Sequence, residues 1–261
     1  MSLSYAIIGD GAVSRELRRH AASDPELDFV GVIVRADDAD PVGAPRLSLD
    51  EALDRVDLVV EAAGVGAVIE HGPIIVADGT DLLVASVGAF ADAGTRASVL
   101  ESGPGRTFLT TGAIGGLDLL GAAGRSGGLD HVELTTRKTP AALVQPSMPD
   151  AERARILAVT APTEIFRGTP AEAIERFPAS LNVAVALGLA VGDLDAVTVV
   201  LVADPEAALT EHDIRARGIS GEYRFTVRNE PSPEHPSSSG LTARALLAGL
   251  RRIAAPAGHF V

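Results

Sequence analysis

Short apolar runs, separated by segments with helical spacing, fill the N-terminal half of the chain. Runs of this length that are apolar on both faces are typical of strands in a parallel sheet. Helices between them return the chain, so that each strand lies parallel to the one before. The pattern predicts an α/β domain whose parallel strands span residues 5–8, 29–34, 57–63, 82–85 and 107–109.

Strand follows strand in the second half, beyond about residue 112. Residues 131–138 alternate between polar and apolar side chains, as a strand with one solvated face does. This succession predicts an antiparallel or mixed sheet, and therefore a second domain of the α+β class. The other segments are predicted as a loop at 140–149, helices at 151–158 and 181–191, strands at 196–203, 213–218 and 222–228, and a Pro- and Ser-rich linker at 230–240.

The turn after the first strand is rich in glycine. Residues 9–14 read Gly-Asp-Gly-Ala-Val-Ser and lead into a predicted helix. Gly9 permits a sharp turn, Gly11 lets main-chain N–H groups approach a diphosphate, and the helix N-terminus adds positive partial charge. Ser14, which is also small, stands where a third glycine is usual. We predict a Rossmann-type cofactor site that includes Gly9, Gly11 and Val13; an ordinary strand–helix turn is the alternative.

Two domains follow from these patterns. Residues 1–111 form the predicted dinucleotide-binding domain, to which residues 240–261 return with an amphipathic helix over 241–253. Residues 112–239 form the predicted substrate domain. We expect the active site between the two.

Small residues at the ends of later strands are candidates for contact with the cofactor, NAD or NADP. Ala63, Ser86 and Gly88 leave room for a flat ring, because ligands of parallel sheets bind beyond the carboxyl ends of the strands. Each of them also suits a plain turn.

The second strand ends near Arg35 rather than at the carboxylate that usually binds the ribose hydroxyls of NAD. A guanidinium there can pair with the 2′-phosphate of NADP, which a carboxylate would repel. In the alternative arrangement Arg35 points to solvent and Asp37 binds the ribose. The first arrangement predicts that NADP is accepted at least as well as NAD.

Composition narrows the classes of partner. The 261 residues carry a formal net charge of −13, which disfavours nucleic acid and anionic membranes. Cys is absent, so disulfides and Cys-ligated metals are excluded, and no two histidines have metal-ligand spacing. No apolar run approaches the roughly 20 residues of a membrane span, and nothing resembles a signal peptide. We expect a cytoplasmic protein without a metal that acts on a small molecule.

Three side chains in the second half are candidates for chemistry. Lys138 is the only lysine among 22 basic residues, which suggests a site that is too narrow for the planar guanidinium of arginine. The alternative is that a lysine occurs by chance in a solvated strand. His212, near a strand start, suits a general base, or else a surface histidine among acidic residues. Asn182 begins an apolar helix, either as its N-cap or with its amide toward a carboxamide such as nicotinamide.

Taken together, these segments resemble the L-aspartate dehydrogenase family over nearly the whole chain. The most specific stretches are residues 112–118, with three glycines, residues 136–138, residues 177–184, residues 203–205 followed by His212, and residues 231–234. The departures from the family's pattern are Ser14, Thr139, Ser180, His235 and Ser237.

The resemblance implies a homodimer that deaminates L-aspartate oxidatively with NAD or NADP and supplies iminoaspartate for NAD biosynthesis. It implies that His212 is the catalytic histidine and that Ala113 and Asn182 contact the cofactor. We expect Lys138 to pair with a substrate carboxylate. Two other interpretations are another NAD(P)-dependent reductase of a small keto or imino acid, and a catalytically silent regulatory protein that binds the cofactor.

Overall fold

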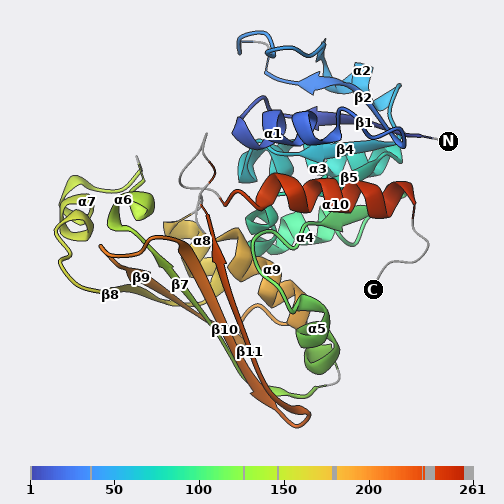
Figure 1. Ribbon diagram of the computed structural model, residues 1–261. Helices are drawn as coiled ribbons and strands as arrows, with labels where there is room; N and C mark the ends of the chain where they lie inside the picture. The colour runs from blue at the N-terminus through green and yellow to red at the C-terminus, as the bar shows by residue number, and fades with distance from the viewer. Residues whose placement is uncertain are drawn as a thin grey trace. The chain divides into compact units, whose positions relative to one another are not determined.

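The computed structural model describes residues 2–35, 37–125, 127–145, 147–177, 181–230, 232 and 239–255. The chain divides into two compact units, coloured along the sequence in Figure 1. The first unit comprises Met1–Gly112 and Thr242–Val261, and the second comprises Ala113–Leu241. None of the helices in the described ranges is both long enough and apolar enough to cross a membrane.

The first unit is built on a parallel sheet of six strands in the order β3-β2-β1-β4-β5-β6. The order reverses between β1 and β4, and ligands of such sheets bind at the carboxyl ends of the strands that flank this reversal. The elements are β1 (Leu3–Ile8), α1 (Ala12–Ala21), β2 (Leu27–Ile33), β3 (Arg46–Leu47), α2 (Leu49–Leu53), β4 (Leu58–Glu61), α3 (Val65–Asp78), β5 (Asp81–Val84), the 3₁₀ helix η1 (Val87–Ala91), α4 (Ala93–Val99), β6 (Thr107–Leu109) and α10 (Thr242–Ala254).

Helices α1 and α10 lie side by side on this sheet, although they come from opposite ends of the chain (Figure 1). Leu17 of α1 and Leu246 of α10 are buried in one apolar cluster with Leu83 of β5. An ion pair of 2.7 Å between Arg251 and Asp24 joins α10 to the loop after α1. Burial of each such leucine contributes about 1.5–3 kcal/mol, so the last helix completes the core of the first unit.

The second unit is built on a mixed sheet of five strands in the order β11-β10-β7-β9-β8. Strands β7 and β9 run parallel, and the other neighbouring pairs in this order run antiparallel. The elements are α5 (Leu117–Arg125), β7 (Leu129–Lys138), α6 (Pro140–Leu143), α7 (Asp150–Leu157), β8 (Thr163–Gly168), α8 (Pro170–Arg176), α9 (Asn182–Val191), β9 (Val197–Ala203), β10 (Thr210–Gly218) and β11 (Gly221–Asn229).

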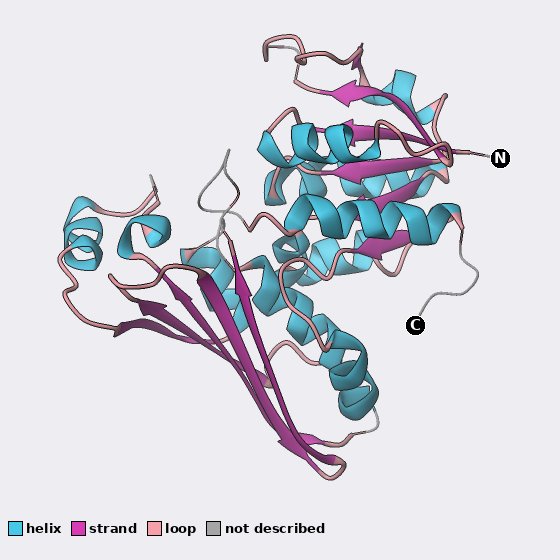
Figure 2. Ribbon diagram, in the orientation of Figure 1, coloured by secondary structure: helices cyan, strands magenta, loops and turns pink. Residues whose placement is uncertain are grey.

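Helices α5, α8 and α9 gather on one face of the second sheet (Figure 2). Apolar side chains of β7 and β9, such as Leu134 and Val199, are buried. In β11, by contrast, every second residue is exposed, including Glu222, Arg224 and Arg228. Because side chains alternate between the faces of a strand, the sheet has one apolar and one polar face.

The fold class expected from the sequence is confirmed: a Rossmann-type α/β unit and a second unit with a mixed sheet. The loop expected at 140–149 is wrong in part, because its first residues form α6. The hydroxyl of Thr139 caps this helix by accepting from the N–H of Ala142 at 3.4 Å. A proline just after a cap is a helix-start signal, but four residues are too few to show apolar periodicity. Thr169 and Glu172 form a capping box, which marks the unexpected helix α8.

Candidate active site

The turn between β1 and α1 has the geometry of an anion site. Gly9 has a φ of 96°, which disfavours side chains, and a Cβ on it would lie 2.8 Å from the Cβ of Ala63. Gly11 is the N-cap of α1, and a Cβ there would meet nothing within 4 Å. No side chain caps this helix end. The N–H groups of the first turn of α1, which includes Val13, therefore suit a phosphate.

The carboxylate of Asp10, in the middle of this turn, is balanced by neighbouring groups. It accepts a short hydrogen bond from Arg18 and another, of 3.2 Å, from the main-chain N–H of Val42. Nη1 of Arg15 lies 3.5 Å from it. Ser14 is fully buried, so its small side chain permits close packing of the first turn of α1. The turn thus fits a dinucleotide despite its acidic residue and its missing third glycine.

The side chain of Arg35 is 84% exposed and is paired with Asp38. Nη2 of Arg35 lies 3.0 Å from Oδ1 of Asp38, and Nε lies 3.2 Å from Oδ2. The hydrogen bond from Arg35 keeps the pKa of Asp38 below its usual value. Arg46 donates to the main-chain carbonyl of Arg35 at 2.6 Å, so a second guanidinium lies close to this part of the main chain. A 2′-phosphate that binds Nε and Nη2 of Arg35 would compete with Asp38 for these nitrogens.

The turns after β4 and β5 are joined through one buried carboxylate. Glu61, the last residue of β4, accepts from the main-chain N–H groups of Ala63 and Ser86, both at 2.8 Å. Ser86 begins η1, in which Gly88 is buried. Ala63, Ser86 and Gly88 therefore lie at the same edge of the sheet as the Gly9 turn.

His212 of β10 and Thr136 of β7 are paired in register, and Nδ1 of His212 lies 2.9 Å from Oγ1 of Thr136. His212 is only 3% exposed, so the alternative of a surface histidine is wrong. Burial, together with the charge of Lys138, lowers the pKa of His212 to about 3. The imidazole is therefore neutral at neutral pH. It is a weak base until a bound substrate changes the charge around it.

Lys138 ends β7, two positions beyond Thr136 and hence on the same face of the sheet. It is 5% exposed, which rules out the solvated strand residue considered above. Burial lowers the pKa of Lys138 to about 8. Its ammonium form predominates below that pH and suits a carboxylate ligand.

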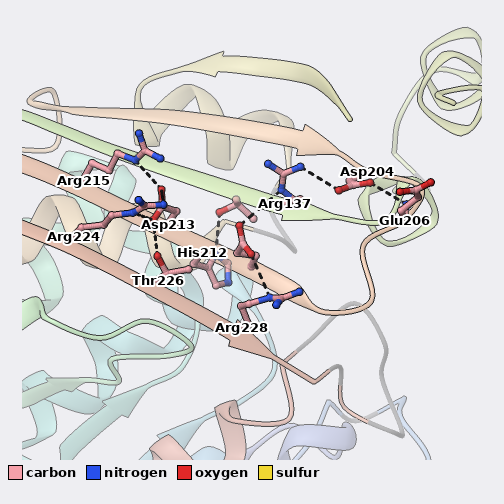
Figure 3. Close-up of polar contacts among 11 residues, drawn as sticks. Arg137, Asp204, Glu206, His212, Asp213, Arg215, Arg224, Thr226 and Arg228 are labelled. Carbon is pink, nitrogen blue, oxygen red and sulfur yellow. Dashed lines mark hydrogen bonds and ion pairs between the residues drawn. The ribbon is translucent and has the colours of Figure 1, made fainter. Parts of the chain in front are cut away.

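Asp213 follows His212 along β10 and so points to the opposite, polar face (Figure 3). Its carboxylate accepts from Thr226 Oγ1 at 2.7 Å, from Arg215 Nε at 2.8 Å and from Arg224 Nε at 2.9 Å. Burial raises the pKa of Asp213, but these hydrogen bonds outweigh it and leave the pKa below its usual value. The cluster links two strands and lies away from His212.

Ala113 and Asn182 both belong to the second unit. Ala113 is buried, and its carbonyl accepts from Nδ2 of Asn229 at 2.9 Å. Asn182 is the first residue of α9, whose N-terminus has no side-chain cap, so the N-cap alternative is wrong. Gly116 has a φ of 79°, and a Cβ on it would lie 2.6 Å from the ring of Phe225. Close packing on β11 therefore explains this glycine.

The structure gathers the candidates into two groups, one in each unit. Ser180, His235 and Ser237, and most of the linker expected at 230–240, lie outside the described residues. Within the described ranges, no group of three or more His, Asp or Glu side chains is arranged to hold a metal ion. The first group comprises Gly9, Gly11, Val13, Arg35, Ala63, Ser86 and Gly88, and the second group comprises Lys138 and His212 with Ala113 and Asn182 in the same unit.

Sequence reasoning missed two polar residues of these groups, Thr136 and Glu61. The contact of Thr136 with His212 depends on strand register, which no local pattern reveals. Glu61 carried a usable signal, because a carboxylate inside the apolar run 58–63 has to find partners.

Two family models match separate parts of the chain. Residues 118–253 match the model described as aspartate dehydrogenase, C-terminal. Residues 8–103 match the model described as homoserine dehydrogenase, NAD binding domain. An archaeal homoserine dehydrogenase in complex with NADPH has the same fold, with a TM-score of 0.57 at 13% identity.

Curated proteins and a crystal structure are similar to nearly the whole chain. L-aspartate dehydrogenase of Ruegeria pomeroyi is 38% identical over 256 residues, which cover 95% of this chain and 91% of the relative. The Cupriavidus necator enzyme is 37% identical over 260 residues, with 95% and 96% covered. Aspartate dehydrogenase of Thermotoga maritima has a TM-score of 0.79 at 29% identity, with 100% and 99% covered. The chain therefore belongs to the aspartate dehydrogenase family and is an NAD(P)-dependent oxidoreductase.

Proposed function

We propose that this enzyme oxidises L-aspartate to iminoaspartate with NAD or NADP. The observation that carries the proposal is the buried group of Thr136, Lys138 and His212 on one face of the second sheet. An imidazole beside an ammonium group suits an amino dicarboxylic acid, which brings a proton to remove and carboxylates to bind. The relatives named above, which are L-aspartate dehydrogenases, support the same substrate.

His212 is the base in this mechanism. When Nδ1–H donates to Thr136, Nε2 carries the lone pair, and proton transfer is assigned to Nε2. His212 takes one proton from the substrate ammonium, and the Cα–H bond then breaks with its electron pair. NAD(P)⁺ held by the first unit would supply the acceptor for that hydride. The amine nitrogen forms a double bond to Cα, which gives an iminium ion.

Lys138 binds a carboxylate of the substrate in its ammonium form. Burial lowers the pKa of His212 most, and the same positive charge lowers it further, so a bound carboxylate that neutralises this charge makes His212 a stronger base. Substrate binding and proton transfer are thereby coupled through these two residues.

The residues of the first unit hold the cofactor. Main-chain N–H groups beside Gly11 bind the diphosphate, and Ala63, Ser86 and Gly88 leave space for the nicotinamide. Ala113 and Asn182 add contacts from the second unit, as the family resemblance implies. These assignments require no cationic side chain at the diphosphate, because the helix N-terminus supplies the positive potential.

Water hydrolyses the iminium ion to oxaloacetate and ammonium, unless iminoaspartate leaves first. Release of iminoaspartate connects the reaction to NAD biosynthesis. Measuring oxaloacetate and ammonium beside reduced cofactor in the first turnovers distinguishes the two routes, since early release leaves oxaloacetate formation lagging.

We further propose that the enzyme is a cytoplasmic homodimer. The resemblance to the aspartate dehydrogenase family supports this assembly. Light scattering coupled to size exclusion tests it by mass. A mass close to the 26.8 kDa of one chain contradicts the dimer.

Turnover of L-aspartate with NAD and with NADP tests the substrate, with oxaloacetate plus ammonium in the reverse direction. D-aspartate, L-glutamate and L-malate are the matched comparisons, since each changes one feature of the substrate. The proposal expects L-aspartate to give the highest kcat/KM. A higher kcat/KM for L-malate would overturn the proposal. So would a higher kcat/KM, in the reductive direction, for a keto or imino acid other than oxaloacetate.

A further inference from the structure

Glu61 is a buried carboxylate surrounded by hydrogen-bond donors. The residue is 0% exposed at the end of β4. Oε1 accepts from the N–H groups of Ala63 at 2.8 Å and Gly64 at 2.7 Å, and from the hydroxyl of Ser86 at 2.9 Å. Oε2 accepts from the N–H of Ser86 at 2.8 Å. One side chain thus satisfies four donors from two separate turns.

Main-chain dipoles, rather than a cation, compensate this charge. Among the described residues Glu61 takes part in no ion pair, and burial of an ionised carboxylate costs several kcal/mol unless its oxygens are satisfied. The donors lie at the start of α3 and of η1, where N–H groups point outward and favour an anion. Burial raises the pKa of Glu61 above its usual value, and the hydrogen bonds from Gly64, Ser86 and Ala63 offset that shift only in part.

The position of this carboxylate matters more than its contribution to stability. Glu61 lies where the strand order reverses, the place at which ligands of such sheets bind. The turn that it holds after β4 is also the turn against which Gly9 packs, since a Cβ on Gly9 would lie 2.8 Å from Ala63. Glu61 therefore holds the turn after β4 directly and the turn after β5 through Ser86. It also supports the Gly9 turn, which packs against the turn after β4.

We propose that Glu61 is a positioning residue for the dinucleotide. Its carboxylate joins the turn after β4 to the turn after β5 before the cofactor arrives, so that Ala63 and Ser86 are already placed to line the site. A preorganised site binds more tightly because binding no longer has to order the two turns. This role concerns the cofactor alone and does not depend on the identity of the substrate.

The variant Glu61→Gln tests the proposal by removing the charge while the shape of the side chain is retained. In the amide, an N–H₂ group replaces one of the two carboxylate oxygens. This group cannot accept from the N–H and O–H donors around it, so at least one hydrogen bond is lost. We expect the Kd for NADPH, titrated by its fluorescence, to rise roughly tenfold, the scale of one hydrogen bond to a charged group. Hydrogen exchange should accelerate at the amides of Ala63, Gly64 and Ser86 and stay unchanged in β10.

Glu51→Gln is the matched control. Glu51 lies in the same unit and also accepts from a main-chain N–H and a serine hydroxyl, both of Ser48, but it caps α2 away from the carboxyl ends of β4 and β5. This variant should keep the Kd for NADPH within about twofold, as expected for a surface change. An unchanged Kd in Glu61→Gln, with faster exchange at the three amides, would overturn the proposal and leave Glu61 a purely structural residue.

Hydrogen exchange of the wild-type protein keeps the proposal testable if Glu61→Gln does not fold. If Glu61 holds the two turns before the cofactor binds, the amides of Ala63, Gly64 and Ser86 should exchange slowly without cofactor. NADPH should then slow their exchange little further. Fast exchange without cofactor, slowed only on binding, would show that the cofactor orders the turns and that Glu61 does not.

Discussion

The two units bury ionisable groups in opposite ways. The first unit encloses the carboxylate of Glu61 among main-chain N–H groups at the edge of a parallel sheet. The second unit encloses Lys138 and His212 on the apolar face of a mixed sheet, where Nδ1 of His212 lies within hydrogen-bond distance of another side chain, Thr136. A parallel sheet points helix N-termini toward one edge and so attracts anions without cationic side chains. A mixed sheet lacks that edge and has to supply charge through its own residues.

This difference assigns separate tasks to the units. The N–H-rich edge of the first unit suits the diphosphate of the cofactor. The titratable pair of the second unit suits the substrate. Changes at the N–H-rich edge of the first unit should therefore alter cofactor affinity, and changes at the titratable pair of the second unit should alter turnover or substrate binding.

Replacing His212 with Ala should have the largest effect. The loss of a general base is expected to lower kcat by about 10²–10⁴, while the Kd for NADPH changes little because His212 is not among the residues proposed to bind the cofactor. The matched control is His131→Ala, on the exposed part of β7, which should keep full turnover. Wild-type kcat in the His212 variant would remove this residue from the mechanism.

Arg35→Ala should weaken NADP binding selectively, by roughly tenfold, because it removes a charged partner of the 2′-phosphate. Asp38→Asn should do the reverse, since Asp38 now occupies the guanidinium. Titration of NAD and NADP into both variants measures the two effects. Equal loss of both cofactors in Arg35→Ala, or a strong wild-type preference for NAD, contradicts this assignment.

Thr136→Val should lower kcat about five- to tenfold, the value of one ordinary hydrogen bond of about 1 kcal/mol. The side chain keeps its shape but no longer orients the imidazole of His212. Thr136→Ser restores the hydroxyl and should recover most of the loss. Equal defects in the Val and Ser variants would mean that packing, rather than the hydroxyl, is what matters.

Lys138→Arg should have the smallest effect, a several-fold rise in KM for aspartate, because a planar fork replaces a compact ammonium. Inhibition by succinate, a dicarboxylate without an amine, measures how much the charge of Lys138 contributes to carboxylate binding. Since burial lowers the pKa of Lys138 to about 8, the ammonium is present below that pH and lost above it. The inhibition constant should then rise about tenfold per pH unit above this value in the wild type, and stay flat in the variant.

Local patterns were sufficient to predict five of the six strands of the first unit, and they missed only the two-residue strand β3. Gly9 and Gly11 mark a turn whose shape depends on residues next to each other, and apolar runs mark strands buried on both faces. The second unit was predicted less completely. The strand 163–168 has only a short apolar centre between charged residues, and the contact of Thr136 with His212 joins residues 76 positions apart. Burial of Lys138 and of His212 likewise depends on which helices cover the sheet, which local sequence does not contain.

Deuterium transfer tests the central claim most directly. L-aspartate labelled with deuterium at Cα is incubated with the enzyme and NADP or NAD, and mass spectrometry measures the deuterium content of the reduced cofactor. Hydride transfer from Cα predicts reduced cofactor that carries the label, in proportion to the ammonium released. Reduced cofactor without deuterium, or ammonium formed without cofactor reduction, would contradict the assignment of this enzyme as an L-aspartate dehydrogenase.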